Sequence, residues 1–503
     1  MRIINKGKYL QVLPQNDDVR LDLLLGYRQR KNDPWYMVEN NVINRLVLGL
    51  TPVIPVERGW DTAILDTSAV QSNAVLDDYQ ITDVEKMCEL KAVLNSNPMG
   101  LGKTIETICY LKSIGAQSVL IVVPKIIRTQ WAAKIEEWWG HEVEIYEKQK
   151  QVTPGKVWIV NYDKLINETA QAKFKRFRWD VLVVDEAHNI KTRTSKRTLA
   201  VKAIPAARRV ALTGTPILRY VDDLWSQLHF LDETYSGVSY WNFVHYFCRQ
   251  QESPWGDKIV GMTTNLEKVG LLNKLLQLVA IRNDSIEVAH GKRIDRVLLP
   301  MEKAQRDLYR KEKALLLDEL PEGMTISNGA VLTMRLRQTT SWPGLYLEGV
   351  AGPKFEWLLE LCLNNPTEKI VVFSVFEKTV QGLAMYLRAN KVRVATITGK
   401  QKDQENELNK RVFIERDAQV LIGTIGAMYQ GYDGLQNASH TIVFVDREWS
   451  PEIMAQAEDR LHRRGQNNLV NVYYLECQAS FDQHVGRINQ NKADDIRRAL
   501  QNE

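Results

Sequence analysis

The sequence predicts an α/β protein with two lobes, each a parallel sheet flanked by helices, with a helical insertion between the lobes and a small N-terminal domain. Three observations support this prediction. Two stretches of the chain alternate short apolar segments with amphipathic segments of helical period, which is typical of parallel sheets. Between them, from about Val221 to Gly352, this alternation stops. The length of 503 residues is too great for one compact core and suits two to four domains.

The first lobe is expected to hold four strands, because four segments are rich in β-branched residues and each runs into a polar or proline-containing turn. The predicted strands are Val119–Val123, Val157–Val160, Val181–Val184 and Arg209–Leu212, and the predicted helices are Thr104–Ser113 and Ile127–Trp139.

The second lobe repeats the same rhythm. The predicted strands are Ile370–Phe373, Val392–Ile397, Val420–Gly423, Thr441–Val445 and Val470–Leu475, and the predicted helices are Phe376–Ala389, Asp403–Glu415 and Pro451–Arg464. In the insertion, Lys268–Leu278 and Glu302–Leu320 have a helical pattern, and near the N-terminus Lys8–Leu13 and Trp35–Val38 are β-prone. We therefore expect domains at 1–75 (small, substrate- or partner-binding), 76–232 (first lobe), 233–352 (insertion and linker), 353–484 (second lobe) and 485–503 (tail or brace helix).

Composition excludes several classes of protein. Hydrophobic residues make up 44% and charged residues 25%, which excludes a wholly disordered or fibrous chain. The net charge of +5 permits a nucleic-acid partner without arguing for one. No segment approaches the roughly 18 apolar residues that cross a bilayer, so we expect no membrane association. The five scattered cysteines favour reduced thiols over disulfides or a zinc site. We expect an intracellular monomer, in the cytoplasm of a bacterium or virus-infected host or in a eukaryotic nucleus.

A glycine-rich segment precedes the first predicted helix and has the chemistry of a phosphate-binding loop. Glycines let backbone N–H groups approach phosphate oxygens, Lys103 places a charge on the phosphates, and Thr104 offers a hydroxyl to Mg²⁺. The strict pattern requires glycine at position 97, where this chain has Asn97. A glycine-rich turn without a nucleotide is the alternative. The candidate loop residues are Met99, Gly100, Leu101, Gly102, Lys103 and Thr104.

An acidic pair follows the predicted strand Val181–Val184, at the edge of the sheet where open α/β sheets bind ligands. Asp185 would hold Mg²⁺ through its water shell, and Glu186 would polarise the attacking water. Alone, such a pair could be a loop cap, but a phosphate-binding loop in the same lobe favours the catalytic interpretation. The turn after the next strand is expected to couple the site to motion; its residues are Thr213, Gly214 and Thr215.

At these residues the chain resembles superfamily 2 helicase-like motors, and more closely the Swi/Snf family of double-stranded DNA translocases, from about Leu76 to His484. The matching segments are Leu76–Gln80, Met99–Thr104, Val122–Lys125, Gln130–Trp131, Val160–Tyr162, Asp185–His188, Thr213–Pro216, Leu332–Leu345, Lys369–Ser374, Thr424–Leu435, Asp446–Pro451 and Gln456–Gln466. The resemblance implies two RecA-like lobes, a DNA-dependent ATPase that uses ATP and Mg²⁺, and adenine recognition by Gln80.

A cationic motif lies in the predicted helix Pro451–Arg464. Gln456, Arg460 and Arg463 are spaced i, i+4 and i+7, so on a continuous helix they would project from one face. If that face closes on ATP held by the first lobe, the arginines could neutralise charge on the γ-phosphate. The alternative is an ordinary basic surface helix.

Candidate contacts to double-stranded DNA are the loop residues Lys125, Arg128, Tyr162, Lys164 and Thr424. Contacts of this kind to the phosphate backbone would be independent of base sequence and sensitive to salt.

Three departures from the resembled family stand out. Asn97 replaces its usual Asp and Pro98 its usual Glu, which concerns the geometry of the phosphate-binding loop. The run GYDGLQ at 431–436 has an extra residue between its glycines, which puts DNA contact or coupling in question.

The aromatic stretch at 33–38 resembles the small HARP-like module beside some annealing translocases, although a docking or solubilising role is at least as well supported.

Three functions stay open from sequence. The first is an ATP-dependent motor that translocates on double-stranded DNA and remodels DNA structures or displaces bound proteins. The second is a strand-separating DNA helicase in recombination or repair. The third is a nucleic-acid-binding scaffold whose ATP site is inactive or acts as a clamp.

Overall fold

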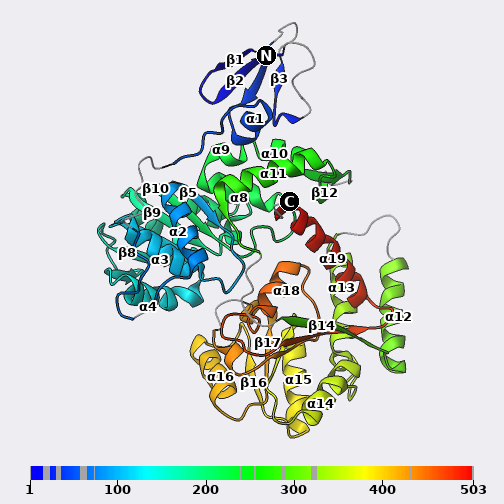
Figure 1. The fold of residues 1–503 in the computed structure, drawn as a ribbon. Helices are drawn as coiled ribbons and strands as arrows, with labels where there is room; N and C mark the ends of the chain where they lie inside the picture. The colour runs from blue at the N-terminus through cyan, green and yellow to red at the C-terminus, as the bar shows by residue number, and fades with distance from the viewer. Residues whose placement is uncertain are drawn as a thin grey trace. The chain divides into compact units, whose positions relative to one another are not determined.

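The computed structural model describes residues 2–14, 23–29, 35–56, 65–72, 74–237, 239–253, 257–284, 291–318, 326–429 and 433–500. The chain forms two compact units (Figure 1): residues 1–286 together with 494–503 make the first unit, and residues 287–493 make the second. Each unit contains a parallel sheet with helices on its faces. The predicted α/β class with two such lobes is confirmed.

The described residues of the first unit form a seven-stranded sheet in the order β13-β5-β10-β9-β6-β8-β7, and all its pairings are parallel. The strands are β5 (Ala92–Asn95), β6 (Val119–Val123), β7 (Val143–Ile145), β8 (Val157–Asn161), β9 (Trp179–Asp185), β10 (Ala206–Leu212) and β13 (Ala280–Ile281). The helices that precede or connect them include α2 (Asp78–Glu89), α3 (Lys103–Ser113), α4 (Arg128–Trp138), α5 (Tyr162–Leu165), α6 (Glu168–Lys175) and α7 (Lys196–Lys202).

Both faces of this sheet are buried. Along β6, Leu120 and Val122 belong to one hydrophobic cluster, whereas Val119, Ile121 and Val123 belong to the other. This alternation follows from the two-residue period of a strand, and burial on both faces explains why β6 has a continuous apolar run. The four strands predicted for this lobe are confirmed; β5, β7 and β13 were not predicted, because each is only two to four residues long.

The stretch that follows Val221, which we expected to be helical, begins with helices and then includes short strands. It contains α8 (Asp223–Leu231), α9 (Glu233–Ser236), α10 (Tyr240–Phe247) and α11 (Leu266–Val279), and a hairpin of β11 (Cys248–Gln251) and β12 (Lys258–Met262). Besides the expected helices, this stretch therefore contains a two-stranded hairpin.

The N-terminal part of the first unit carries its own antiparallel sheet, in the order β1-β2-β4-β3. Its elements are β1 (Arg2–Asn5), β2 (Tyr9–Leu13), β3 (Arg28–Gln29), β4 (Tyr36–Glu39) and α1 (Val42–Val47). The two β-prone runs predicted here are confirmed as β2 and β4. Residues 33 and 34 of the aromatic stretch lie outside the described residues.

The second unit has a sheet whose described strands run in the order β14-β19-β18-β15-β17-β16, again with parallel pairings. Its strands are β14 (Lys292–Leu299), β15 (Ile370–Ser374), β16 (Val394–Ile397), β17 (Val420–Thr424), β18 (Thr441–Phe444) and β19 (Val470–Cys477). Its helices include α12 (Lys303–Asp318), α13 (Ile326–Ser341), α14 (Pro353–Asn364), α15 (Glu377–Ala389), α16 (Asp403–Glu415), α17 (Ile425–Met428), α18 (Pro451–Glu458) and α19 (Phe481–Leu500).

The five strands predicted for the second lobe are confirmed, whereas β14 lies in the stretch expected to be insertion and linker. Among the described strands it pairs only with β19, at the edge of the sheet, and its side chains are partly or largely exposed. An edge strand can therefore be rich in charged residues and lack the apolar run by which buried parallel strands are recognised.

Among the described residues, no helix is both long and apolar enough to cross a membrane.

Candidate functional site

The glycine-rich segment after β5 forms a loop that leads into α3. Gly100 and Gly102 have φ values of 85° and 89°, a backbone conformation that favours glycine. A Cβ atom on Gly102 would lie 2.3 Å from Nε2 of Gln80, so a side chain here would displace the end of Gln80 as well as strain the backbone. The loop therefore presents bare backbone at the start of α3, where N–H groups and the helix dipole attract anions.

Lys103 opens α3, and its ammonium group turns back over the loop. Its Nζ donates to the carbonyl oxygens of Asn97 at 2.7 Å and Pro98 at 3.1 Å. Burial lowers the pKa of Lys103, and the nearby charges of Glu186 and Asp185 oppose this effect. Lys103 and the acidic pair therefore interact electrostatically within one unit.

The acidic pair lies where β9 ends. Glu186 has a left-handed backbone with φ 51°, which sharply turns the chain after Asp185. Burial and the charge of Glu186 raise the pKa of Asp185 to about 7, although Trp131 Nε1 donates a hydrogen bond of 2.8 Å to its Oδ2. Both residues are only 9% exposed.

The turn after β10 packs beside both features. A Cβ atom on Gly214 would lie 2.9 Å from the Met99 side chain and 3.5 Å from Lys103 Nζ, so this turn touches the phosphate-binding loop. The buried Thr213 hydroxyl accepts a hydrogen bond from the Thr215 N–H at 3.1 Å.

His188 joins this turn to the acidic pair. Its Nδ1 lies 3.3 Å from Thr213 Oγ1 and 3.3 Å from Glu186 Oε2. Burial lowers the pKa of His188 to about 3, so the imidazole is neutral near pH 7 and its contact with Glu186 is not an ion pair.

Asn97 lies beneath the loop in a buried polar cluster that sequence reasoning missed. Its Nδ2 donates to Asp83 Oδ2 at 2.7 Å, and its Oδ1 accepts from the Asn283 N–H at 3.0 Å. Glu106 of α3 completes the cluster, and burial raises the pKa of this carboxyl group to about 8. Asp83 and Asn283 are far apart in sequence and match no motif, so only the fold brings them together.

Gln80 lies against the loop and is 3% exposed. Its Nε2 donates to the Leu101 carbonyl at 2.9 Å, and its Oε1 accepts from the Asp77 N–H at 3.0 Å in a capping box at the start of α2. Gln80 thus supports the loop backbone and the helix terminus; adenine recognition stays a prediction.

The residues present fit a bound nucleoside triphosphate with Mg²⁺. A glycine cradle whose backbone conformation disfavours side chains, a lysine at the first helical position, the Thr104 hydroxyl and the Asp185 carboxyl group provide the donor set of such a site. No group of three or more His, Cys, Asp and Glu residues in the described part of the chain could hold a metal ion by itself.

In the second unit, the continuous helix predicted over Pro451–Arg464 is wrong, because α18 ends at Glu458. Beyond this point, the N–H groups of Arg460 and Leu461 donate to carbonyls three residues back, which tightens the chain into turns. The buried Glu458 is held by Lys292 at 2.5 Å and by Tyr474, and Gly465 with φ 95° redirects the chain.

The turns nevertheless bring the two arginines together. Arg463 forms an ion pair with Asp433, and Arg460 Nη1 lies 3.9 Å from the same carboxylate. Arg460 Nε also donates to the Gln456 carbonyl, and Gln456 is fully buried. Asp433 belongs to the irregular run 431–436, of which residues 431 and 432 lie outside the described residues.

The predicted DNA contacts differ in their environments. Tyr162 is 4% exposed and its hydroxyl donates to the Asp185 carbonyl, so it supports the acidic turn from inside and does not face solvent. Arg128 and Lys164 both pair with Glu147. Lys125 lies exposed before α4, and Thr424 ends β17.

A family model described as the SNF2-related domain matches residues 79–345, and one described as the helicase conserved C-terminal domain matches residues 353–465. Curated relatives include a protein named probable ATP-dependent DNA helicase CHR12 from Arabidopsis thaliana, 27% identical over 82% of this chain and 40% of that protein. Another is the SWI/SNF-related matrix-associated actin-dependent regulator of chromatin subfamily A member 1 from Mus musculus, 26% identical over 82% of this chain and 42% of that protein.

The chain thus spans about two fifths of the length of these curated relatives. A solved structure described as the Sulfolobus solfataricus SWI2/SNF2 ATPase core in complex with dsDNA is 21% identical, covers 88% of this chain and 99% of that chain, and has a TM-score of 0.39. Because the SNF2-related domain model matches more than half of the residues of this chain, the chain belongs to the SNF2-related domain family.

Proposed function

We propose that this protein is an ATP-hydrolysing motor that translocates on double-stranded DNA and remodels DNA structures or displaces bound proteins. The observation that carries the proposal is the arrangement in the first unit, where Lys103, the acidic pair and the Thr213–Thr215 turn surround one glycine cradle. Membership of the SNF2-related domain family supports the same chemistry.

In this proposal the first unit holds the nucleotide. The loop Met99–Thr104 binds the phosphates, with Lys103 exchanging its loop carbonyl acceptors for phosphate oxygens. Thr104 and Asp185 hold Mg²⁺, which when bound would neutralise charge on the phosphates. Glu186 orients the attacking water, and its left-handed backbone and His188 fix the carboxyl group relative to Thr213.

The second unit supplies positive charge to the reaction. Arg460 and Arg463 already interact with one carboxylate, that of Asp433, so their guanidinium groups can act on a single anion. A γ-phosphate is such an anion, and neutralising its developing charge is the proposed role of both arginines.

Double-stranded DNA is the proposed track. The names of two relatives from Arabidopsis thaliana describe DNA helicases. Lys125, Arg128, Lys164 and Thr424 are the proposed contacts, with Arg128 and Lys164 leaving Glu147 for phosphates of the DNA backbone. Residues 1–75 are proposed to bind a substrate or partner.

The decisive measurement is the rate of ATP hydrolysis with duplex DNA, single-stranded DNA, RNA or no nucleic acid. We expect duplex DNA to stimulate turnover most, and equal rates under all four conditions would refute the motor. Lys103→Ala and Glu186→Gln should each reduce turnover by at least about 100-fold, because each removes a group that acts on the phosphates or the water. Lys196→Ala, an exposed change in the same unit, is the matched control and should leave the rate unchanged.

A strand-separating helicase is the second candidate, favoured by the word helicase in the names of two Arabidopsis relatives. A tailed duplex with a labelled strand distinguishes the two functions. Release of that strand in the presence of ATP would favour the helicase, whereas displacement of a bound protein roadblock without strand release would favour the translocase.

A further inference from the structure

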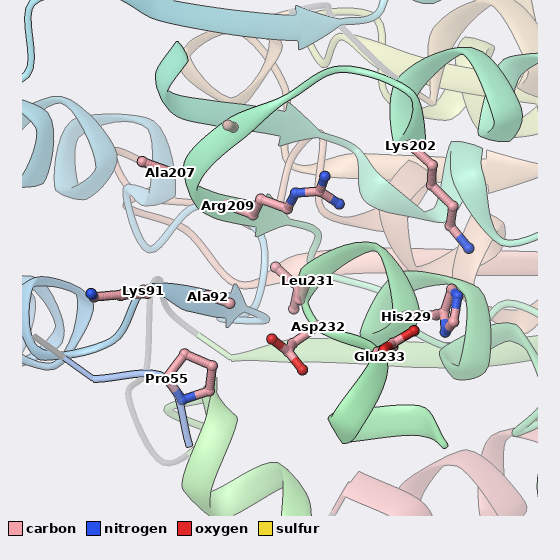
Figure 2. Close-up of a pocket in the computed structure, with 11 residues that line it drawn as sticks. Pro55, Lys91, Ala92, Lys202, Ala207, Arg209, His229, Leu231, Asp232 and Glu233 are labelled. Carbon is pink, nitrogen blue, oxygen red and sulfur yellow. The ribbon is translucent and has the colours of Figure 1, made fainter. Parts of the chain in front are cut away.

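A pocket of about 430 Å³ lies at the opposite end of the first sheet from the phosphate-binding loop. It is lined at the amino-terminal ends of β5 and β10 and at the end of α8, whereas the nucleotide site follows the carboxyl ends of β5 and β9. The residues that define this Lys202–Arg209 pocket here are Lys91, Lys202, Arg209, His229, Leu231 and Asp232 (Figure 2).

Two cations converge on this pocket from different elements. Lys202 is the last residue of α7, and Arg209 lies in β10. Figure 2 shows the Arg209 guanidinium extending toward the side where the Lys202 ammonium group and the His229 ring lie. Burial lowers the pKa of Lys202 to about 8, and the charge of Arg209 adds to this effect.

Neither cation forms an ion pair with a residue that the structure describes, although the charge of nearby Asp232 acts on Arg209 and raises its pKa against the lowering effect of burial. Lys202 Nζ lies 5.1 Å from the centre of the Trp225 ring and has no hydrogen-bond acceptor or ion-pair partner there. Arg209 donates one N–H to the Phe230 carbonyl at 2.6 Å and one to the Ile204 carbonyl at 3.3 Å, which uses two of its five N–H groups.

The carboxylates of the lining have other partners. Asp232 Oδ1 accepts from the N–H and hydroxyl groups of Thr234, at 2.8 Å and 2.6 Å, and Glu233 pairs with Lys8 at 3.0 Å. Burial lowers the pKa of His229 to about 4, so its ring is neutral near pH 7. Two partly buried cations thus line one cavity without a direct ion-pair partner, and a doubly charged ligand could interact with both of them.

We propose that the Lys202–Arg209 pocket binds the phosphate group of a small phosphate monoester. A phosphate monoester carries about two negative charges at neutral pH and so matches both cations, whereas a carboxylate would match only one. The volume exceeds that of the phosphate group alone, and Leu231 and Pro55 give the remainder of the ligand an apolar wall. A pocket of this volume favours a small molecule over the backbone of a duplex.

The test is isothermal titration of the full chain with inorganic phosphate and with glycerol 3-phosphate. All titrations use the Lys103→Ala background, so that the proposed nucleotide site does not contribute. We expect one saturable site for both probes. Lys202→Met should weaken binding by about tenfold or more, since hydrogen bonds to charged groups are worth about 1.5–3 kcal/mol.

Two controls make the result decisive. Lys196→Met removes the same charge from an exposed position on α7 and should leave binding unchanged, and Lys202→Arg should retain it. Thermal melts verify that each variant is folded. The proposal is overturned if neither probe shows saturation below about 10 mM, or if Lys202→Met and Lys196→Met weaken binding equally.

The pH dependence gives an independent readout. From pH 7 to 9 Lys202 loses its proton, so binding to the parent protein should weaken while binding to the Lys202→Arg variant persists. The other titratable or charged groups lining the pocket are Arg209 on β10, His229 on α8, Asp232 after it, Glu233 on α9 and Lys91 before β5. A pH profile that is identical in the two proteins would contradict the role of Lys202.

Discussion

Asn97 shows how one residue can explain a departure from the resembled family. The family usually has Asp at this position, but here the side chain lies between the carboxyl groups of Asp83 and Glu106, with its amide nitrogen 2.7 Å from Asp83. An amide can donate to one neighbour and accept from Asn283, whereas a carboxylate could only accept. Asn97 therefore fits this loop because Asp83 is present.

Asn97→Asp should destabilise the first unit by about 1–3 kcal/mol, because it places a third carboxyl group in a buried cluster and removes a donor. Urea unfolding measures the free energy of unfolding, and a binding titration measures the affinity for ATP. Both quantities should decrease. Asp83→Asn in the same chain should restore most of the loss, because it returns a donor to the pair. Equal destabilisation by the single and double variants would contradict this account.

At the scale of residues, the sequence predicts what motifs encode and misses what packing alone brings together. Lys103, Asp185, Glu186 and Thr213 are recognisable because phosphate chemistry restricts residue type and spacing, and the structure places them around one cradle. The hydrogen bond from Trp131 to Asp185 spans 54 residues of sequence and follows from the packing of α4 on the sheet. No local pattern encodes such a contact.

Among the elements, α8 carries a buried acidic start. Asp222 precedes its first residue and accepts a hydrogen bond from the Tyr240 hydroxyl at 2.9 Å. Burial raises the pKa of Asp222 from 3.8 to about 6, with a further contribution from Asp223, while Tyr240 opposes the shift. The folded protein therefore keeps a proton on this group that the unfolded chain releases at lower pH.

Asp222→Asn should make unfolding less dependent on pH. Between pH 4 and 6 the unfolded chain binds fewer protons at Asp222 than the folded protein does, so the stability of the parent protein falls as pH rises. The amide keeps the acceptor for Tyr240 without this penalty. Relative to the parent protein, the variant should gain up to about 3 kcal/mol between pH 4 and 7, measured by urea unfolding at both pH values. A constant difference across this range would contradict the assignment.

The elements predicted from sequence are those whose local pattern agrees with their environment. The strands β6 and β15 are buried on both faces and read as continuous apolar runs. The strand β14 has charged residues because it lies at an edge, and α18 stops where Glu458 is held by Lys292, a residue 166 positions earlier. Contacts with residues far away in the sequence therefore determine both the edge position of β14 and the end of α18.

At the scale of the whole second unit, one buried ion pair ties several elements together. Lys354 of α14 is 1% exposed, and its Nζ donates to the Val445 carbonyl at 2.6 Å and pairs with Asp482 of α19 at 2.8 Å. Asp482 also accepts from the Thr340 hydroxyl and the Cys477 N–H. Burial is the largest single effect and by itself would lower the pKa of Lys354, but the charge and hydrogen bond of Asp482, together with the charges of Cys477 and Asp446, raise the pKa.

Lys354→Met should lower the free energy of unfolding of the second unit by about 3–5 kcal/mol, because it leaves the Asp482 carboxylate buried without its cation. Chemical unfolding monitored by circular dichroism measures this loss. Arg393→Ala is the matched control: its pair with Asp417 is 67% and 81% exposed, and its removal should cost less than about 1 kcal/mol. A loss of similar size in both variants would show that the buried pair contributes no more to the free energy of unfolding than the exposed pair does.

The pairing of β14 with β19 has a consequence for synthesis of the chain. Register runs from Lys292 opposite Val470 to Leu299 opposite Cys477, so the two strands are about 180 residues apart when the ribosome makes them. While the nascent polypeptide emerges, β14 has to wait for its partner, and a fragment that starts at Pro353 would leave one side of β19 with unsatisfied backbone donors and acceptors. Such a fragment should associate with itself through that bare strand, whereas a fragment that starts before Lys292 should remain monodisperse.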